Sequence, residues 1–155
     1  MAYDALYLSF LVYFNRDRDY FECHEVMEEL WLSKGSDPLY KGLLQVAVGL
    51  FHFRANNVRG SRMMMESALK RLAPYSDDSL GIDLGRLKQE VEDFLLQLDH
   101  YGVKPFEFYD LTIHIVDPAL EEATQIAAQN LQPNEPIQLK RMRGPKHDLR
   151  GTDRT

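Results

Sequence analysis

The sequence contains one cysteine, Cys23, and no uninterrupted apolar run long enough for a membrane-spanning helix. A single cysteine cannot form an intramolecular disulfide, which excludes a small disulfide-stapled secreted domain. A membrane-spanning helix needs about 20 consecutive apolar residues, whereas the apolar stretch over residues 42–53 is interrupted by Gln45 and His52. Because the N-terminus also lacks the pattern of a secretory signal, we expect a cytoplasmic protein that does not span a membrane.

Several motifs of well-understood enzymes and metal proteins are also missing. The chain has no Gly-rich phosphate loop, no Gly-x-Ser-x-Gly turn and no Cys-x-x-Cys pair. Their absence argues against nucleotide hydrolysis, serine-esterase chemistry and structural zinc. The Glu-x-x-His pattern of ferritin-like di-iron proteins is absent as well, which argues against that class of carboxylate site.

The charge of the chain is unevenly distributed. The net charge is −6, yet residues 132–155 carry six Lys or Arg against three acidic residues, so the rest of the chain is strongly acidic. An acidic body repels a phosphate backbone, and we therefore do not expect the domain to bind nucleic acid. Residues 132–155 are rich in Pro and Gly and poor in large apolar groups, which predicts a flexible basic tail.

Helical periodicity and helix-capping signals run through the first 131 residues. A chain of 155 residues with 45% apolar residues is typical of one domain that buries a core. Aspartates before apolar-periodic segments, two of them followed by Pro, predict helix starts. We therefore expect a single all-α domain over residues 1–131, a compact bundle of about six helices. The expected helices are 2–14, 19–34, 39–57, 61–72, 83–100 and 118–131.

The third expected helix, residues 39–57, is apolar nearly all round, so we expect neighbouring helices to bury it on several sides. The short link that joins it to the second helix predicts an antiparallel hairpin at the centre of the bundle. Gly42 and Gly49 would permit the two helices of this hairpin to approach closely.

Both helices of the hairpin carry polar residues on their apolar faces. At 100° per residue, His24 and Glu28 fall inside the apolar arc of the second helix, and Glu25 falls at its margin. Further polar residues align on the third helix: Gln45, His52 and Asn56. Because buried polar groups need partners, we predict that the two polar lines face each other in the dry interior.

Three interpretations of this cluster are open. The first is a hydrogen-bonded network that satisfies its own members. The second is a divalent metal, such as zinc, iron or manganese, held by His24, Glu28 and His52, with one position open for water. The third is a metal-free acid–base site or small-ligand pocket, in which burial raises the pKa of Glu28 and lowers the pKa of the histidines.

The residues around the cluster resemble those of a known family. The matching pattern is Phe14-Asn15, Tyr20-Phe21-Glu22-Cys23-His24-Glu25-Val26-Met27-Glu28-Glu29-Leu30-Trp31, Lys41-Gly42-Leu43-Leu44-Gln45-Val46-Ala47-Val48, His52, Asn56 and Gly60. It resembles the prokaryotic family called domain of unknown function 309, over residues 13–72. Ser61 stands where many relatives carry Ala.

The resemblance implies an all-helical bundle and a label of metal-dependent hydrolase. It also brings Glu25 into the site. In a hydrolase of this kind, Glu25 or Glu28 would deprotonate a metal-bound water whose pKa the metal has lowered, and Gln45 and Asn56 would help to bind the ligand. The expected partners are a small-molecule ligand and, in a homodimer, a second copy of the chain.

The rival hypothesis is a non-catalytic interaction or structural module. In this hypothesis the polar cluster is a hydrogen-bonded core network that only fixes the register of the helices. Partners would then bind through the surface of Met63, Met64 and Met65 or through the basic tail.

Overall fold

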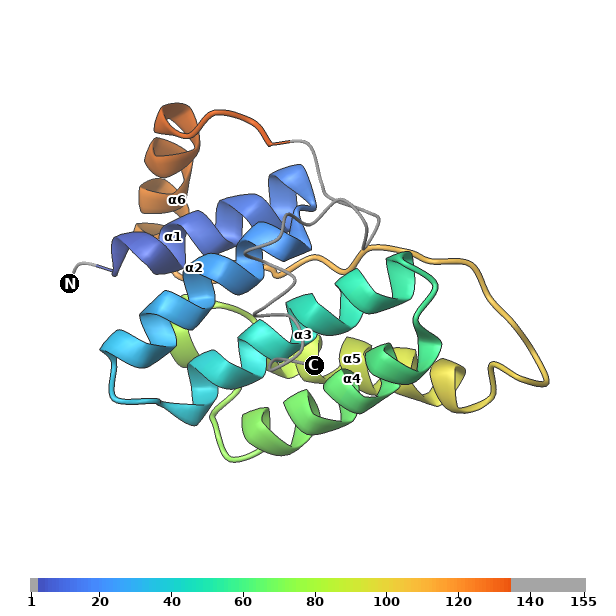
Figure 1. The fold of residues 1–155 in the computed structure, drawn as a ribbon. Helices are drawn as coiled ribbons and strands as arrows, with labels where there is room; N and C mark the ends of the chain where they lie inside the picture. The colour runs from blue at the N-terminus through green and yellow to red at the C-terminus, as the bar shows by residue number, and fades with distance from the viewer. Residues whose placement is uncertain (1–2, 135–155) are drawn as a thin grey trace.

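The computed structural model describes residues 3–134 of the chain, and regular structure in that range is helical apart from one isolated antiparallel bridge between Ile82 and Ile115 (Figure 1). This arrangement confirms the predicted all-α fold class. The elements are α1 (Ala5–Val12), the π-helix η1 (Tyr13–Asp17), α2 (Tyr20–Ser33), α3 (Pro38–Arg54), α4 (Val58–Leu72), the short 3₁₀ helix η2 (Ser79–Gly81), α5 (Leu84–Asp99) and α6 (Pro118–Asn130). The predicted tail lies outside the described residues from position 135 onward. None of the helices over residues 3–134 has the length and apolar character needed to cross a membrane.

Aspartate side chains begin most of these helices. Each accepts a hydrogen bond from a backbone N–H in the first turn, which satisfies one of the donors that a helix start leaves without an intrahelical partner. The capping residues are Asp4, Asp19, Asp37, Asp83 and Asp117. The predicted starts near residues 19, 83 and 118 are therefore confirmed.

The predicted start of the fourth helix at residue 61 is wrong, because α4 begins at Val58. The side chain of Asn57 accepts a hydrogen bond from the N–H of Gly60, and Asn57 is the N-cap of α4. Asn56 adopts a positive φ of 67°, a left-handed conformation that Asn tolerates better than most residues. The predicted end of the third helix at residue 57 is also wrong, since α3 ends at Arg54, so the turn lies three residues earlier in the chain than the sequence indicated.

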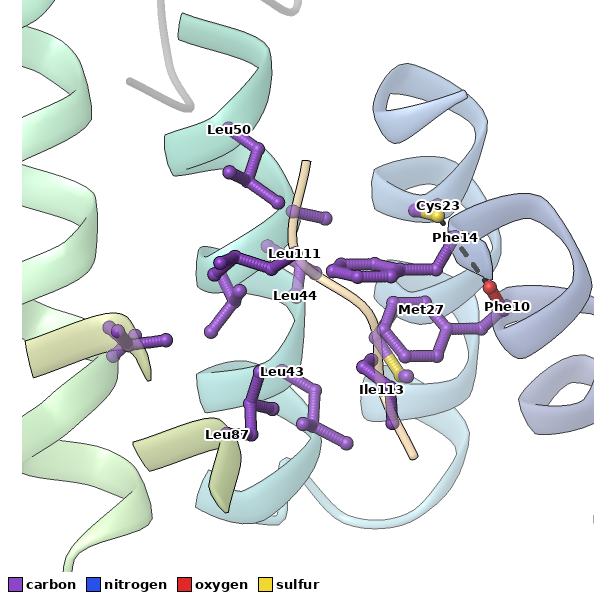
Figure 2. Close-up of a cluster of buried hydrophobic side chains, with 14 of the residues drawn as sticks. Phe10, Phe14, Cys23, Met27, Leu43, Leu44, Leu50, Leu87, Leu111 and Ile113 are labelled. Atoms are coloured by element: carbon purple, nitrogen blue, oxygen red, sulfur yellow. Dashed lines mark hydrogen bonds between the residues drawn. The ribbon is translucent and has the colours of Figure 1, made fainter. Parts of the chain in front are cut away.

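α3 is the central helix of the bundle. Its residues from Gly42 to Phe53 are all buried, as its apolar sequence predicts, and it packs between α2 and α4. Figure 2 shows one side of this core, where leucines of α3 face aromatic rings of the N-terminal segment. The labelled side chains in the figure are Phe10, Phe14, Cys23, Met27, Leu43, Leu44, Leu50, Leu87, Leu111 and Ile113.

Gly42 and Gly49 set the distance between α3 and α4. A Cβ atom at Gly42 would lie 2.7 Å from Cδ2 of Leu72, and one at Gly49 would lie 2.9 Å from Cε of Met65. Leu72 and Met65 belong to α4 and are fully buried. The prediction that these glycines bring α2 close to α3 is wrong, since periodicity places both on one face of α3 without showing which neighbour that face meets.

The connection between α5 and α6 is anchored to the bundle around Arg54. The guanidinium of Arg54 lies 4.7 Å from the ring centroid of Tyr20 and 5.7 Å from that of Phe108, and it donates to the carbonyl of Arg18 at 2.8 Å. The Tyr20 hydroxyl donates to Asp110. Burial lowers the pKa of Arg54, and the cation–π contacts offset part of the cost of burying its charge.

Replacing Gly42 by Leu should destabilise the protein by about 1–3 kcal/mol, because the new side chain would overlap Leu72 in a packed interface. The free energy of unfolding in urea would measure the loss. Gly102→Ala is the control, since a Cβ at Gly102 meets no atom within 4 Å, and we expect it to change stability by less than about 0.5 kcal/mol. Equal effects of the two substitutions would contradict the close α3–α4 contact.

The buried carboxyl group of Asp19 should make the free energy of unfolding depend on pH. Its carboxylate is 4% exposed, and burial raises its pKa. Because the folded state then binds the proton more tightly than the unfolded chain, the free energy of unfolding falls as the pH rises through the raised pKa. Asp19→Asn keeps a capping side chain without the charge, so unfolding measured from about pH 4 to pH 7 should show a flatter dependence in this variant. A slope equal to that of the natural sequence would contradict the assignment.

Candidate functional site

Two side-chain contacts fix the register of α2 against α3. The Lys41 ammonium lies 4.6 Å from the ring centroid of Trp31. Ten residues earlier on α2, the ring of Phe21 lies 6.0 Å from the ring of Phe51 on α3. Since position 31 pairs with 41 and position 21 with 51, the two helices run antiparallel with one constant register between these contacts.

This register shows at which level along the two helices each predicted site residue lies. His24 lies at the level of Val48, and Glu28 lies at the level of Leu44. His52 lies one helical turn beyond Val48, about 6 Å further along α3. His24, Glu28 and His52 therefore lie at different levels along the two helices.

His24 and Glu25 form a pair on α2. His24 is buried, and its Nδ1 lies 3.4 Å from a carboxylate oxygen of Glu25, whose side chain is 23% exposed. A carboxylate beside Nδ1 favours a proton on that nitrogen, which leaves Nε2 as the basic nitrogen of a neutral imidazole. Glu28 is half-buried, so the prediction that its carboxylate lies in the dry interior is wrong.

Gln45 is buried, as predicted, but its carboxamide is used on the other side of α3. Its Oε1 accepts a hydrogen bond from Nε of Arg71, on α4, at 3.1 Å. Gln45 thus shares the α4-facing side of the helix with Gly42 and Gly49. The prediction that the polar line of α3 faces the polar line of α2 is therefore wrong at Gln45.

His52 is 6% exposed and lies in the last turn of α3. Its Nδ1 is 3.4 Å from Nδ2 of Asn57. Because the Asn57 oxygen already accepts from the N–H of Gly60 at 2.9 Å, the NH₂ group of Asn57 faces the imidazole. Nδ1 of a neutral His52 is then the acceptor, and Nε2 carries the proton.

A cavity of about 170 Å³ opens beside this imidazole, where α3 turns into α4. It is lined by His52, Asn57, Arg59, Gly60, Met63 and Met64. We call it the His52 pocket. Its lining contains one permanent cation, one imidazole and two thioethers, and it contains no acidic side chain.

Asn56, which the sequence predicted to bind a ligand, is exposed in the turn and does not line the His52 pocket. The neighbouring Asn57 lines it instead, together with Arg59. Sequence reasoning missed both residues. The signal that could have found Asn57 is its place three residues before Gly60, at the start of a helical pattern, which is typical of an N-cap.

Over residues 3–134, no group of three or more His, Cys, Asp or Glu side chains is placed so that it could hold a metal ion. The predicted ligands His24, Glu28 and His52 accordingly do not form such a group. Histidine and carboxylate are ordinary ligands of divalent metals, so the arrangement of these side chains, and not their chemistry, does not fit a metal ion.

Comparison with known proteins places the chain among its relatives. A family model described as "Domain of unknown function (DUF309)" matches residues 7–64. "Uncharacterized protein YpuF" of Bacillus subtilis (strain 168) is 33% identical over 129 residues, which cover 80% of this chain and 72% of that protein. The chain belongs to the DUF309 family. Its match to an uncharacterized protein of Aquifex aeolicus (strain VF5), 31% identical over 80 residues, covers 50% of this chain and 24% of that protein.

No solved structure matches the chain significantly. The DUF309 match, residues 7–64, includes α2, α3 and the first half of α4. Every residue that lines the His52 pocket lies inside it. The pocket is therefore built entirely from the part of the chain that the family model describes.

Arg71→Met should destabilise the protein by about 1–3 kcal/mol, because it removes the donor to the buried Gln45 oxygen. Lys70→Met is the control, since Lys70 is a neighbouring exposed cation of α4, and we expect it to change stability by less than about 0.5 kcal/mol. Chemical denaturation would measure both. In a Gln45→Leu background the Arg71 substitution should lose its effect, and a full effect in that background would contradict the hydrogen bond.

Proposed function

We propose that this DUF309 protein binds a small molecule with an anionic group in the His52 pocket. The observation that carries the proposal is the composition of the lining, which holds Arg59 and the imidazole of His52 and no acidic side chain. Arg presents several N–H donors that match a carboxylate or a phosphate. A cavity of about 170 Å³ has room for such a group and a short apolar part.

The lining indicates which residues would bind the anionic group of such a ligand and which would contact its apolar part. The Nε2–H of a neutral His52 is a hydrogen-bond donor, so it can share the anionic oxygens with Arg59. Met63 and Met64 supply adaptable apolar walls for the remaining atoms. Asn57 acts by orienting the imidazole through its NH₂ group.

Any chemistry beyond binding would depend on side chains of α2. The His24–Glu25 pair has the arrangement of an imidazole oriented by a carboxylate, which is typical of general bases. Catalytic roles for Glu25 and Glu28 stay predictions. The arrangement of the potential ligands among the described residues does not support metal-dependent hydrolysis.

The rival hypothesis of an interaction module needs Met63, Met64 and Met65 on one exposed surface, and the structure exposes only part of that set. Met65 is fully buried and faces Gly49, so Met63, Met64 and Met65 do not form a shared surface. Met63 and Met64 line the His52 pocket instead. A small ligand therefore fits these side chains better than a protein partner does.

Titration of the protein with inorganic phosphate and with acetate, followed by amide NMR shifts, tests the proposal. We expect shifts at residues 52 and 57–64, and Arg59→Met should weaken binding about tenfold or more because it removes a charged donor. Arg62→Met is the control, since Arg62 lies one turn further along α4 outside the lining. Equal weakening by both variants, or no shift at these residues, would contradict the proposal.

Metal analysis of protein purified without an affinity tag or a chelator separates the proposal from a metal-dependent hydrolase. We expect no stoichiometric zinc, iron or manganese, because no three potential ligands of the described residues are placed to hold one. A natural protein that binds one metal ion per chain and hydrolyses an ester would contradict the proposal if His24→Ala lost both properties. The site would then be a metal centre and not an anion-binding pocket.

A further inference from the structure

The α1 helix continues into a π-helical turn at Tyr13–Asp17. Such turns are rare and are frequent at functional sites. In this turn, Asn15 forms two hydrogen bonds with the backbone of Ile113: its Nδ2 donates to the carbonyl at 2.8 Å, and its Oδ1 accepts from the N–H at 2.9 Å. The π-helix thus fixes residues 113–115 beside the end of α1.

α6 lies across α1, and its end is fixed from the same turn. The guanidinium of Arg16 donates to the carbonyl of Ala128 at 2.8 Å and to that of Leu131 at 3.3 Å. A cavity of about 400 Å³ lies between α1, η1, residues 113–115 and α6. We call it the α6 pocket, and its volume is in the range of small-molecule sites. The residues that line it are Leu11, Val12, Asn15, Arg16, Ile113, His114, Ile115, Glu121, Thr124, Gln125 and Ala128.

The one cation in this lining is already paired, and the one carboxylate is exposed to solvent. Arg16 contacts Asp17 at 2.8 Å, and Glu121 accepts a hydrogen bond from Gln125 at 3.0 Å. An anionic ligand would therefore find no unpaired cation among these residues, and a cationic ligand would gain little from the exposed Glu121 carboxylate, which water solvates. The floor of the pocket is apolar, formed by side chains of α1 and of residues 113–115: Leu11, Val12, Ile113 and Ile115.

Polar groups remain for a ligand at one edge of this floor. Oγ1 of Thr124 is buried without a hydrogen-bond partner among the described residues, and a buried hydroxyl in that state carries an energetic cost that a partner would relieve. The half-buried imidazole of His114 also lines the pocket. The fold uses His114 through its backbone, since its carbonyl accepts from the N–H of Asp83 at 2.7 Å.

We propose that the α6 pocket is a second binding site, which takes a neutral and mainly apolar organic molecule with one hydrogen-bonding group, of the class of phenols and indoles. The apolar part lies on the aliphatic floor, and the polar group exchanges hydrogen bonds with His114 and with Thr124, whose buried Oγ1 turns toward the pocket by rotation about the Cα–Cβ bond. The site is independent of the His52 pocket and shares no lining residue with it.

Amide NMR titration of the full chain with phenol, with toluene and with benzoate tests this site. We expect phenol to shift residues 11–16, 113–115 and 121–128, toluene to bind more weakly, and benzoate to bind weakest because no free cation meets it. No shift in these segments up to the solubility limit of phenol, or benzoate binding as tightly as phenol, would overturn the proposal.

Two variants sharpen the test. Thr124→Val keeps the shape of the side chain and removes the hydroxyl, so phenol binding should weaken about fivefold or more while toluene binding stays unchanged. Ala128→Leu should fill the pocket and weaken both probes. The thermal midpoint of Thr124→Val should equal or exceed that of the natural sequence, since the variant loses an unpaired buried hydroxyl. Phenol binding that Thr124→Val leaves intact would contradict the assigned hydrogen bond.

Discussion

The burial of α3 on every side is the constraint on which the rest of the structure depends. A polar group on a fully buried helix costs several kcal/mol unless it has a partner, so each polar side chain of α3 fixes the position of a neighbour. Gln45 accepts from Arg71 on α4, and His52 pairs with Asn57 in the following turn. Arg54 reaches back to the start of α2 and donates there to a backbone carbonyl. One helix thereby positions the elements on three of its sides.

The two glycines on α3 explain where the His52 pocket lies. Gly42 and Gly49 bring α4 so close to α3 that no space is left between the two helices at these levels. The next turn of α3 carries His52 in place of a glycine, and here the chain reverses through Asn56 and Asn57 to start α4. The pocket thus lies beyond the two glycines, at the end of α3 where the chain turns into α4.

The two cavities differ in the part of the chain that builds them. The His52 pocket is formed by residues of α3 and α4 inside the DUF309 match. The α6 pocket combines the π-helical turn, which lies in the matched residues, with residues 113–128, which lie beyond them. The first pocket therefore lies wholly within the matched residues, whereas the second also needs residues that follow position 64.

The sequence by itself determined the fold class, most helix starts, the burial of α3, the burial of its His52 and the family. These features depend on spacing along one helix, which periodicity and capping residues encode locally. Only the tertiary structure decided that Gln45 faces α4, that Asn57 and not Asn56 meets His52, and that Glu28 is half-buried. Periodicity gives the angle of a side chain about its own helix axis, but packing between distant segments decides which neighbour occupies that angle.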